Sequence, residues 1–486
     1  MALNSKRKSA ILLGWHGYQM DNILLIDYGS TYTKVTAVNV SESRLLGCAS
    51  AYTTVDTGVG EGLENALMEL ERQTGKLEFH KRLACSSAAG GLRMVAIGLV
   101  PELTAKAASM ASMGAGAKIV GLYSYELTED DAAEITATSP DILLLTGGTD
   151  GGNSKCVLHN AEMLASVAGE FPIIVAGNRS GGHEAMRLLA HHRAYLCENV
   201  MPSIGELNIE PARKLIREIF LERIVRAKGL DGDMGLSADK GPGSGGKPGG
   251  RAPDYSVLMP TPAAVLTATQ LLAAQTGNLV AIDVGGATTD VYSITDGAPR
   301  GAGVIYKGLP EPFAKRTVQG DIGMRYSAQG IVEAAGISRI AKLAGLSEET
   351  VSGHVEYLTE HTDTLPETSG QKALDFALAA AAIETATLRH AGSLEEAYTA
   401  TGRVYIQTGK DLSDVVKIVL TGGALIHAEK QADLAAYALY SDREPQSLRP
   451  KKAEVLIDKN YILASMGLLC GYSQPAAIEI IKTALT

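Results

Sequence analysis

Cysteines are few in this chain, and none of them forms a Cys-x-x-Cys pair. The five are scattered: Cys48, Cys85, Cys156, Cys197 and Cys470. An odd, dispersed set predicts a reducing compartment and argues against zinc or iron–sulfur sites. No apolar run approaches the roughly 18 residues of a transmembrane helix, and the short apolar run near the start does not fit a secretory signal. We therefore expect a cytoplasmic protein.

Positive charge is also too sparse for a nucleic-acid-binding surface. The chain has 44 Lys and Arg residues against 54 Asp and Glu residues, a net charge of −10, whereas nucleic-acid binding needs a basic footprint. Apolar residues make up 45% of the 486 residues and charged residues 20%, which is typical of folded globular proteins. Glycine is abundant, at 53 residues, and predicts many tight turns. We expect partners other than nucleic acids and membranes.

The sequence predicts four segments. Residues 1–19 show neither helical nor strand periodicity, so we interpret them as a loose N-terminal extension. Residues 241–250 read GPGSGGKPGG, a composition that cannot bury a core. We therefore predict a first lobe over 20–228, a flexible Gly/Pro-rich linker over 229–255, and a second lobe over 256–486.

Two motifs recur in the same order in both predicted lobes. ILLIDYGSTYTKVTAV (23–38) and LVAIDVGGATTDVYSI (279–294) each have an apolar strand, Asp-x-Gly, a turn with threonine and a second β-rich run, as in a β-hairpin. DILLLTGGTDGG (141–152) and VKIVLTGGALIH (416–427) each have an apolar strand that ends in Thr-Gly-Gly. The recurrence predicts a duplicated α/β domain.

The first of these motifs has a chemical meaning. A strand that ends in Asp-x-Gly places a carboxylate beside backbone N–H groups that glycine leaves accessible, an arrangement that suits Mg²⁺ and phosphate. One such turn is common in ordinary hairpins. Two copies in corresponding lobes can hold one polyphosphate between them, so the pair predicts a nucleotide cleft between the lobes.

These motifs resemble those of the superfamily that contains actin, the Hsp70 chaperones and the sugar kinases. DYGSTYTK (27–34) is similar to its first phosphate motif, DVGGATTD (283–290) to its second, and LTGGALIH (420–427) to its adenosine motif. The resemblance implies two duplicated actin-like (ribonuclease H-like) α/β lobes, with ATP and Mg²⁺ bound in the cleft between them.

The same resemblance implies roles for individual residues. Asp27 and Asp283 match the metal aspartates, and Asp290 matches the carboxylate that follows the second turn; we take all three as catalytic candidates. The candidates for binding the nucleotide come from the three motifs: Gly29, Ser30, Thr31, Lys34, Gly285, Gly286, Thr288, Gly422 and Gly423.

One position departs from the chaperone pattern. The chaperones carry a glutamate where the first connecting helix begins, and the best match here is Met259. We therefore expect a slow ATPase. Asp290 and Asp321 are alternatives for orienting water, although Asp321 also fits a solvated loop, and we assign no general base.

Further segments narrow the resemblance to the glutamate mutase L (MutL) family over residues 20–486. They include CSSAAGGLRMVAIGL (85–99), ENVMPSIGELNIEPAR (198–213) and RTVQGDIGMRYSA (316–328). The resemblance implies a chaperone-like, ATP-dependent reactivating factor whose partner is an adenosylcobalamin-dependent mutase. The DNA mismatch-repair protein that shares this name is a different protein: DTGVGEG (56–62) imitates its ATPase motif, but 23–50 read as strands where that fold needs a helix.

Two other functions stay open. A small-molecule kinase of the same fold would use Asp290 or Asp321 to activate a hydroxyl group, and a nucleotide-binding scaffold would show negligible turnover. Several remaining polar residues fit structural or surface positions as well as a site: Ser86, Ser87, Asn153, Lys155, His191 and His192.

Overall fold

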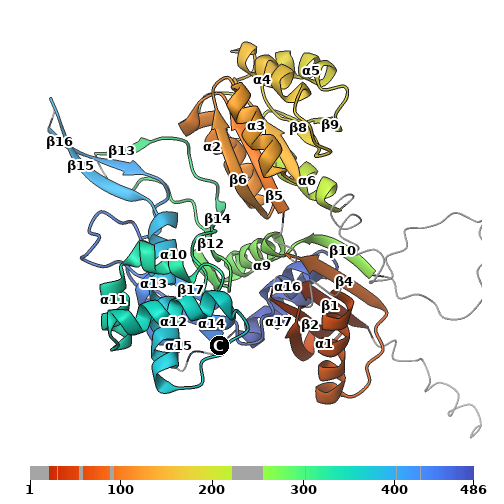
Figure 1. The fold of residues 1–486 in the computed structure, drawn as a ribbon, viewed down its shortest axis with the longest axis vertical. Coiled ribbons are helices and arrows are strands. Elements are labelled where there is room, and N and C mark those ends of the chain that lie inside the picture. Colours follow the sequence, from red (N-terminus) through yellow and green to blue (C-terminus); the bar gives the residue numbers. More distant parts are fainter. Residues whose placement is uncertain are drawn as a thin grey trace, which may run out of the picture.

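The structure is a computed structural model that describes residues 21–29, 31–53, 59–87, 92–221, 255–301, 303–400, 402–426, 428 and 430–485. The predicted extension 1–19, Ser30, and the predicted linker up to residue 254 lie outside the described residues. The described part folds into layered helices and sheets (Figure 1).

The first sheet has five strands in the order β10-β4-β1-β2-β3. Strands β1, β2 and β3 are antiparallel neighbours, while β4 and β10 run parallel to β1. Every residue of β1 is buried, as expected for a central strand that is covered on both faces. The strands span Asn22–Tyr28 (β1), Tyr32–Asn39 (β2), Arg44–Tyr52 (β3), Lys81–Ser86 (β4) and Tyr255–Pro260 (β10).

A second sheet repeats this topology position by position. Its order is β14-β12-β11-β17-β18, with an antiparallel β11–β12 hairpin, an antiparallel β14 and two parallel strands. The prediction of two duplicated, actin-like lobes is confirmed. The strands span Leu279–Val284 (β11), Thr289–Ile294 (β12), Ala314–Gln319 (β14), Lys417–Thr421 (β17) and Glu454–Ile457 (β18).

A third sheet shows that the two Thr-Gly-Gly segments are not equivalent in the fold. Between β4 and β10 the chain forms a parallel sheet in the order β6-β5-β7-β8-β9, and we call residues 92–221 the insert. Thr146-Gly147-Gly148 ends β7 of this insert, so its predicted equivalence to residues 421–423 was wrong. The structural counterpart of β17 is β4. The strands span Leu92–Gly98 (β5), Ala117–Ser124 (β6), Ile142–Leu145 (β7), Ile173–Val175 (β8) and Ala194–Leu196 (β9).

The false equivalence has a physical cause. A buried parallel strand reads as a short apolar run in any α/β layer, and glycines after it reflect only the tight turn that follows. Gly147 and Gly148 have φ of 146° and 72°. Each Thr-Gly-Gly segment therefore marks only the end of a strand. The shared segment is not evidence that β7 and β17 have a common origin.

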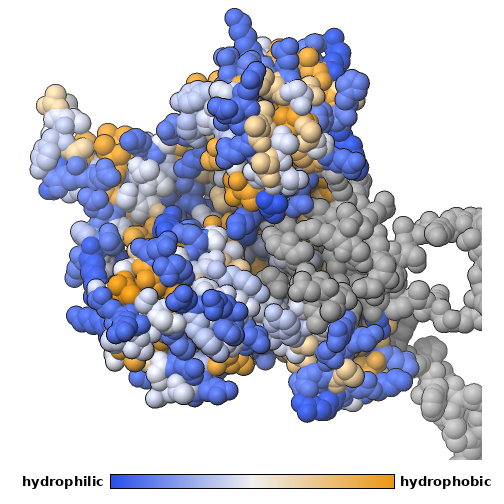
Figure 2. All heavy atoms as spheres, viewed as in Figure 1, coloured by the Kyte–Doolittle hydropathy of each residue, from blue (hydrophilic) through white to orange (hydrophobic). Residues whose placement is uncertain are grey.

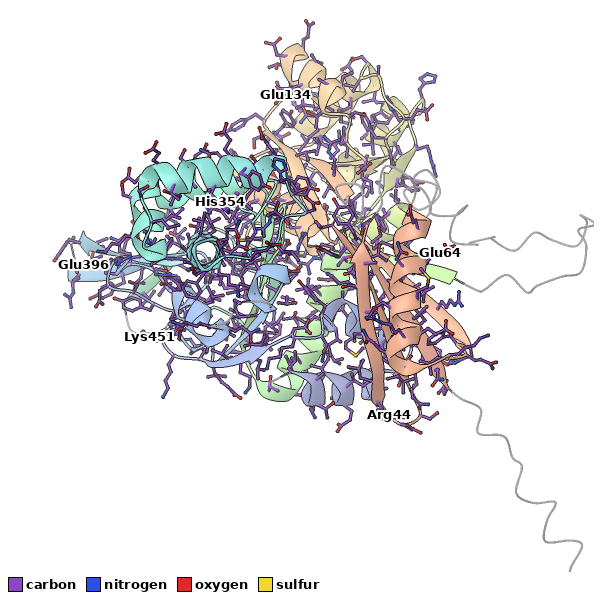
Figure 3. All side chains as sticks on the ribbon, turned by 60° about the horizontal axis from the view of Figure 1, so that its bottom comes forward. Arg44, Glu64, Glu134, His354, Glu396 and Lys451 are labelled. Carbon is purple, nitrogen blue, oxygen red and sulfur yellow. The ribbon has the colours of Figure 1, made fainter. Side chains whose placement is uncertain are left out.

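Helices cover both faces of the insert, as in doubly wound sheets. One face packs on η2 (Pro101–Ala105), α2 (Lys106–Gly114) and α6 (Glu210–Ile219), and the other on α3 (Glu129–Thr138), α4 (Lys155–Ala165) and α5 (Arg179–Leu188). The insert stands above the two lobes in Figure 1. Figure 3 shows Glu134 of α3 at its outer edge.

Helices α9 (Thr261–Thr276), α16 (Leu463–Cys470) and α17 (Gln474–Ala484) join the two lobes. They share one apolar core with residues of both sheets, such as Ile23 and Leu279. Helix α9 is apolar over most of its surface, which is typical of a helix buried on all sides. The chain thus leaves the first sheet after Pro260 and returns to it with its C-terminal helices, whereas the sequence places all of 256–486 in the second lobe.

The remaining helices pack on one lobe each. Helix α1 (Val59–Thr74) packs on the first sheet, and α10 (Ala328–Ala335), α11 (Ile337–Ala344), α12 (Glu348–Glu360), α13 (Ser369–His390), α14 (Gly423–Ile426), α15 (Gln431–Ala435) and η4 (Ala436–Ala438) belong to the second lobe. Figure 2 shows apolar patches scattered among hydrophilic residues on one face. Across the described ranges, every helix is too short or too polar to span a bilayer.

A small sheet projects from the second lobe. Strands β13 (Val304–Lys307), β16 (Gly402–Thr408) and β15 (Ser393–Thr399) lie in that order and form an arm at the edge of the molecule (Figure 1). Glu396 lies near its outer end in Figure 3.

Candidate functional site

A cleft of about 2010 Å³ runs between the two lobes and reaches the insert. Its walls include the turns after β1 and β11, the loop after β17, and the start of helix α9. The carboxyl ends of the central strands thus meet at one place, where ligands of open α/β sheets usually bind.

The two hairpin turns are closed by equivalent hydrogen bonds. The Gly29 N–H donates to the Tyr32 carbonyl at 3.1 Å, and the Gly285 N–H donates to the Thr288 carbonyl at 2.9 Å. A β-carbon at Gly29 would lie only 2.5 Å from the Tyr32 carbonyl oxygen, so the turn requires glycine there.

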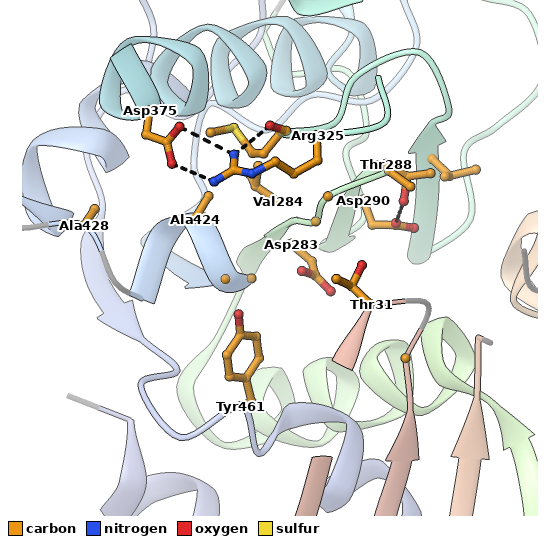
Figure 4. Close-up of a pocket in the computed structure, with 18 of the residues that line it drawn as sticks. Thr31, Asp283, Val284, Thr288, Asp290, Arg325, Asp375, Ala424, Ala428 and Tyr461 are labelled. Atoms are coloured by element: carbon orange, nitrogen blue, oxygen red, sulfur yellow. Dashed lines mark hydrogen bonds and ion pairs between the residues drawn. The ribbon is translucent and has the colours of Figure 1, made fainter. Parts of the chain in front are cut away.

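The turns face each other across the cleft. The Thr31 hydroxyl oxygen lies 3.5 Å from the position that a β-carbon of Gly286 would occupy. Figure 4 shows Thr31 of the first lobe beside Asp283 of the second. The structure therefore brings together the predicted candidates from both turns, except Ser30, which lies outside the described residues.

Asp27 is held by three neighbours inside its own half of the cleft. The Thr261 hydroxyl donates to Asp27 Oδ1 at 2.6 Å, and the Lys34 ammonium lies 3.4 Å from Oδ2. The Cys85 thiol approaches Oδ1 at 3.5 Å. Lys34 stands directly opposite Asp27 in the β1–β2 register. A short hydrogen bond and an ion pair fix this carboxylate at the mouth of the first turn.

Asp283 occupies the matching place in the second lobe without comparable support. Among the residues that the structure describes, no group donates a hydrogen bond to its carboxylate. Burial raises the pKa of Asp283 to about 7, and the carboxylates of Asp290, Asp27 and Asp458 add to the rise, while Lys34 opposes it. The centre of the cleft therefore has a local excess of negative charge.

Asp290 lies opposite Asp283 in the β11–β12 register and has its own cation. Two nitrogens of the Arg316 guanidinium contact Asp290 Oδ1, Nε at 2.8 Å and Nη2 at 2.7 Å. The Thr288 hydroxyl donates to its other oxygen at 3.2 Å (Figure 4). Because both members of the ion pair are buried, this carboxylate is committed to Arg316.

Tyr461 forms the floor of the cleft beside Lys34. The Lys34 ammonium lies 4.2 Å from the centre of the Tyr461 ring, a cation–π distance. Burial alone would lower the pKa of Lys34, but Asp27, Tyr461 and Asp283 together raise it above its usual range. Tyr461 has a left-handed backbone, with φ of 53°, which is uncommon for a residue other than glycine.

The loop after β17 packs closely on the second turn. Gly422 has φ of 102°, and a β-carbon there would lie 2.4 Å from the Val284 carbonyl and 2.8 Å from Asp283 Oδ1. A β-carbon at Gly423 would lie 2.7 Å from the Tyr461 hydroxyl. Glycine is therefore required at position 422, where the close neighbours are backbone atoms, and both glycines line the cleft.

These residues fit a divalent cation that is shared with a polyphosphate. Asp27 and Asp283 come from facing lobes, and the nearby cations Lys34 and Arg316 are paired with Asp27 and Asp290. Within the described ranges no three His, Cys, Asp or Glu side chains are grouped so as to hold a metal alone. That suits Mg²⁺, which binds through one or two carboxylates together with water and phosphate oxygens.

Two sequence candidates lie elsewhere. Met259 is on β10 opposite Cys85 and packs into the core between the lobes. Asp321 is exposed, is held by an ion pair with Arg389 at 2.8 Å, and is not among the residues that line the cleft. Its position therefore fits a solvated loop. Of the two candidates for orienting water, Asp290 lines the cleft and Asp321 does not.

Sequence reasoning missed one buried carboxylate beside the cleft and several residues that line it. Asp458 is buried and accepts from the Ile462 and Leu463 N–H groups and from the Thr421 hydroxyl, and burial raises its pKa. The others are Thr261, Arg316, Tyr461 and Lys118. Tyr461 and Lys118 lie far from both hairpins in sequence, whereas Thr261 and Arg316 lie near the second hairpin but carry no local pattern that marks a contact with a carboxylate.

Comparisons with known proteins match almost the whole chain. The family model described as "MutL protein" matches residues 23–241 and 244–485. Protein MutL of Clostridium tetanomorphum is 43% identical over 473 residues, which cover 95% of this chain and 99% of that protein.

Similar solved structures are far more distant. Gluconate kinase from Lactobacillus acidophilus is 11% identical with a TM-score of 0.34, covering 96% of this chain and 92% of that chain. Component A of (R)-2-hydroxyglutaryl-CoA dehydratase from Acidaminococcus fermentans is 10% identical with a TM-score of 0.28, covering 96% and 99%.

Proposed function

The chain belongs to the MutL family, and from that premise we propose that it is an ATP-dependent, chaperone-like reactivating factor for an adenosylcobalamin-dependent mutase of the glutamate mutase or aminomutase type. The observation that carries the proposal is the pair of facing hairpin turns with Asp27 and Asp283 in one cleft. The partner is inferred from the family resemblance. Strands β1 to β3 occupy residues 22–52, which supports the distinction from the mismatch-repair protein.

We assign nucleotide-binding roles by position in the cleft. The turn residues would contact phosphates through their N–H groups and hydroxyls: Gly29, Thr31, Gly285, Gly286 and Thr288. Ser30, which lies outside the described residues, is assigned the same role from the sequence motif alone. Lys34 would add a positive charge, and Asp27 and Asp283 would hold Mg²⁺. Gly422 and Gly423 would face the nucleoside. The bound Mg²⁺ would supply the charge that the Asp283 environment lacks.

The residues present favour slow hydrolysis. Met259 offers no proton acceptor at the position where the chaperones carry a glutamate. Asp290 is held by the two-point contact with Arg316, so it can orient water or the second turn but is a poor base. We therefore propose that hydrolysis resets a conformational switch, and that lobe movement, rather than phosphate chemistry, acts on the mutase.

We place that lobe movement at helices α9 and α16. Both lie between the sheets and pack on each other, so a change in the angle between the lobes would pass through them. A nucleotide can shift this angle only if it binds the two arrangements with unequal affinity, and partner binding must then change nucleotide affinity by the same factor.

Reactivation of an inactivated mutase tests the proposal. Purified protein is added to mutase that holds damaged cofactor, with fresh adenosylcobalamin and with ATP, ADP or no nucleotide. We expect mutase activity to return only with ATP, and release of the damaged cofactor to precede it. The Asp283→Asn variant is the matched control and should fail.

Other outcomes identify the alternatives. Transfer of the terminal phosphate to a small molecule, with no effect of the protein on the mutase, would show a kinase. Tight ATP binding without turnover or reactivation would show a nucleotide-binding scaffold. Reactivation that is independent of nucleotide would refute the ATP-driven mechanism.

A further inference from the structure

One cation reaches the cleft from outside both lobes. Lys118 lies at the start of β6 in the insert and lines the same cleft as the two hairpin turns. A β-carbon at Gly320 of the second lobe would lie 2.9 Å from the Lys118 ammonium nitrogen. The side chain therefore crosses from the insert to the second lobe.

Gly320 adjoins the second hairpin turn. Strands β12 and β14 pair Thr289 with Gln319, so Gly320 lies beside Thr288 at the next step of the ladder. A β-carbon at the nearby Gly323 would lie 2.5 Å from the Ala287 carbonyl oxygen. The ammonium of Lys118 is thus placed next to the turn to which we assign phosphate contacts.

Lys118 differs from the other cations beside these turns. Lys34 is paired with Asp27 and Arg316 with Asp290. In the described part of the chain, no hydrogen-bond acceptor or carboxylate is paired with Lys118. A half-buried ammonium beside a phosphate turn is suited to bind an anionic oxygen.

Arg316 holds the segment that presents Lys118. Besides its contact with Asp290, its Nη1 donates to the Met113 carbonyl at 3.1 Å and to the Ala117 carbonyl at 2.8 Å. Ala117 directly precedes Lys118. An unbroken chain of contacts therefore runs from the second hairpin through Asp290 and Arg316 to the first residue of β6.

The same interface has two further polar contacts. Lys106 of α2 pairs with Glu311 of the second lobe at 3.2 Å. Arg213 of α6 donates to the Ala314 carbonyl at 3.5 Å. Several polar contacts therefore hold the insert against β14 and the segment before it, and of the contacts named here those of Arg316 continue to the hairpin.

We propose that Lys118 is a phosphate-contacting residue supplied by the insert, with Arg316 as its positioning residue, so that the terminal phosphate of the nucleotide fixes the insert against the second lobe. The inference rests on the proposed function, because it takes a nucleoside triphosphate as the ligand. It adds that the insert is the element whose attachment differs between the triphosphate and diphosphate forms.

Nucleotide affinity tests the contact. We expect Lys118→Met to weaken binding of Mg–ATP at least 10-fold in calorimetry and that of Mg–ADP less than 3-fold, with Lys118→Arg restoring most of the ATP preference. Gly320→Ala keeps the charge but places a methyl group 2.9 Å from the ammonium, so it should lower ATP binding by a smaller factor. Lys155→Met, the same change at an exposed position at the start of α4 in the insert, should leave both affinities unchanged.

Hydrogen exchange tests the coupling. In the wild type, amides of residues 113–118 should exchange more slowly with ATP than with ADP, and Lys118→Met should abolish the difference. Arg316→Lys should reduce it even at saturating ATP, because a lysine cannot contact Asp290 and both carbonyls together.

The outcomes separate the two proposals. If Lys118→Met and Gly320→Ala keep the wild-type ratio of ATP to ADP affinity, Lys118 contacts no terminal phosphate and the inference fails while the nucleotide site stands. If the wild type itself binds no Mg–ATP, the proposed function fails first.

Discussion

The two hairpins at the centre of the cleft share a backbone but differ in charge. In the first, the β1–β2 register sets Lys34 opposite Asp27; in the second, the β11–β12 register sets Asp290 opposite Asp283. The same position therefore has a cation in one lobe and a carboxylate in the other. Duplication preserved the turn, while the electrostatics of the two copies diverged.

The residues around the two central carboxylates, Asp27 and Asp283, also differ. Asp27 has Thr261, Lys34 and Cys85 around it. Asp283 has other carboxylates nearby, and Arg316 is committed to Asp290. The carboxylate of the first half is thus paired within the protein, whereas Asp283 in the second half has no comparable partner among the described residues.

Removing the carboxylate that is specific to the second hairpin should have the largest effect. Asp290→Asn leaves the buried Arg316 without its counter-ion, and breaking one side of a buried ion pair costs about 3–5 kcal/mol. We expect the urea midpoint to fall accordingly. The double variant Asp290→Asn, Arg316→Met should recover part of the loss; equal midpoints for wild type and Asp290→Asn would contradict the pairing.

Neutralising either central carboxylate tests whether both halves serve one metal. Asp27→Asn and Asp283→Asn should each weaken Mg–ATP binding by about 2–4 kcal/mol, roughly 30- to 700-fold, by analogy with the loss of a charged, desolvated contact. Calorimetry with Mg²⁺ and with EDTA should show that the loss depends on the metal. Unchanged affinity in both variants would rule out a shared metal site.

The same two variants should change stability without ligand in opposite directions at pH 8. The raised pKa of Asp283 means that its ionisation disfavours the folded state; the cost is absent near pH 4, grows as the pH rises to about 7, and is then constant. Asp283→Asn removes this cost and should stabilise the protein by about 1–3 kcal/mol at pH 8. Asp27→Asn loses the pairing with Lys34 and should destabilise it. Thermal unfolding at pH 4.5, 6 and 8 would reveal both trends, and a stabilisation of Asp283→Asn that is independent of pH would contradict the assigned cause.

The sequence predicted the parts of this arrangement that are local. Both hairpins follow from an apolar strand, Asp-x-Gly and a second strand. The spacing of seven residues, from Asp27 to Lys34 and from Asp283 to Asp290, already places the two residues of each pair opposite each other across the hairpin. The period of a strand is a local property, so these elements could be predicted from neighbouring residues alone.

The parts that depend on long-range contacts could not be predicted in this way. The insert was hidden because its strand β7 ends in the same Thr-Gly-Gly as β17. Tyr461 and Lys118 are 427 and 84 residues from Lys34 in sequence, and nothing near them in the chain marks a site. Their roles arise only when the C-terminal segment and the insert fold back onto the cleft.

The smallest expected effect distinguishes the two halves most directly. Thr261→Val removes the hydroxyl that donates to Asp27 at 2.6 Å, and the loss of one such hydrogen bond should weaken Mg–ATP binding by roughly 1 kcal/mol, about 5-fold. Thr267→Val on the same helix, where the hydroxyl bonds only to the Ala263 carbonyl, is the matched control. Because the hydroxyl acts through Asp27, its effect should vanish in an Asp27→Ala background, which removes the acceptor, and persist in an Asp283→Asn background. The full 5-fold loss in both backgrounds would mean that Thr261 acts on the ligand independently of Asp27, and that the first carboxylate is less supported by the protein than its contacts indicate.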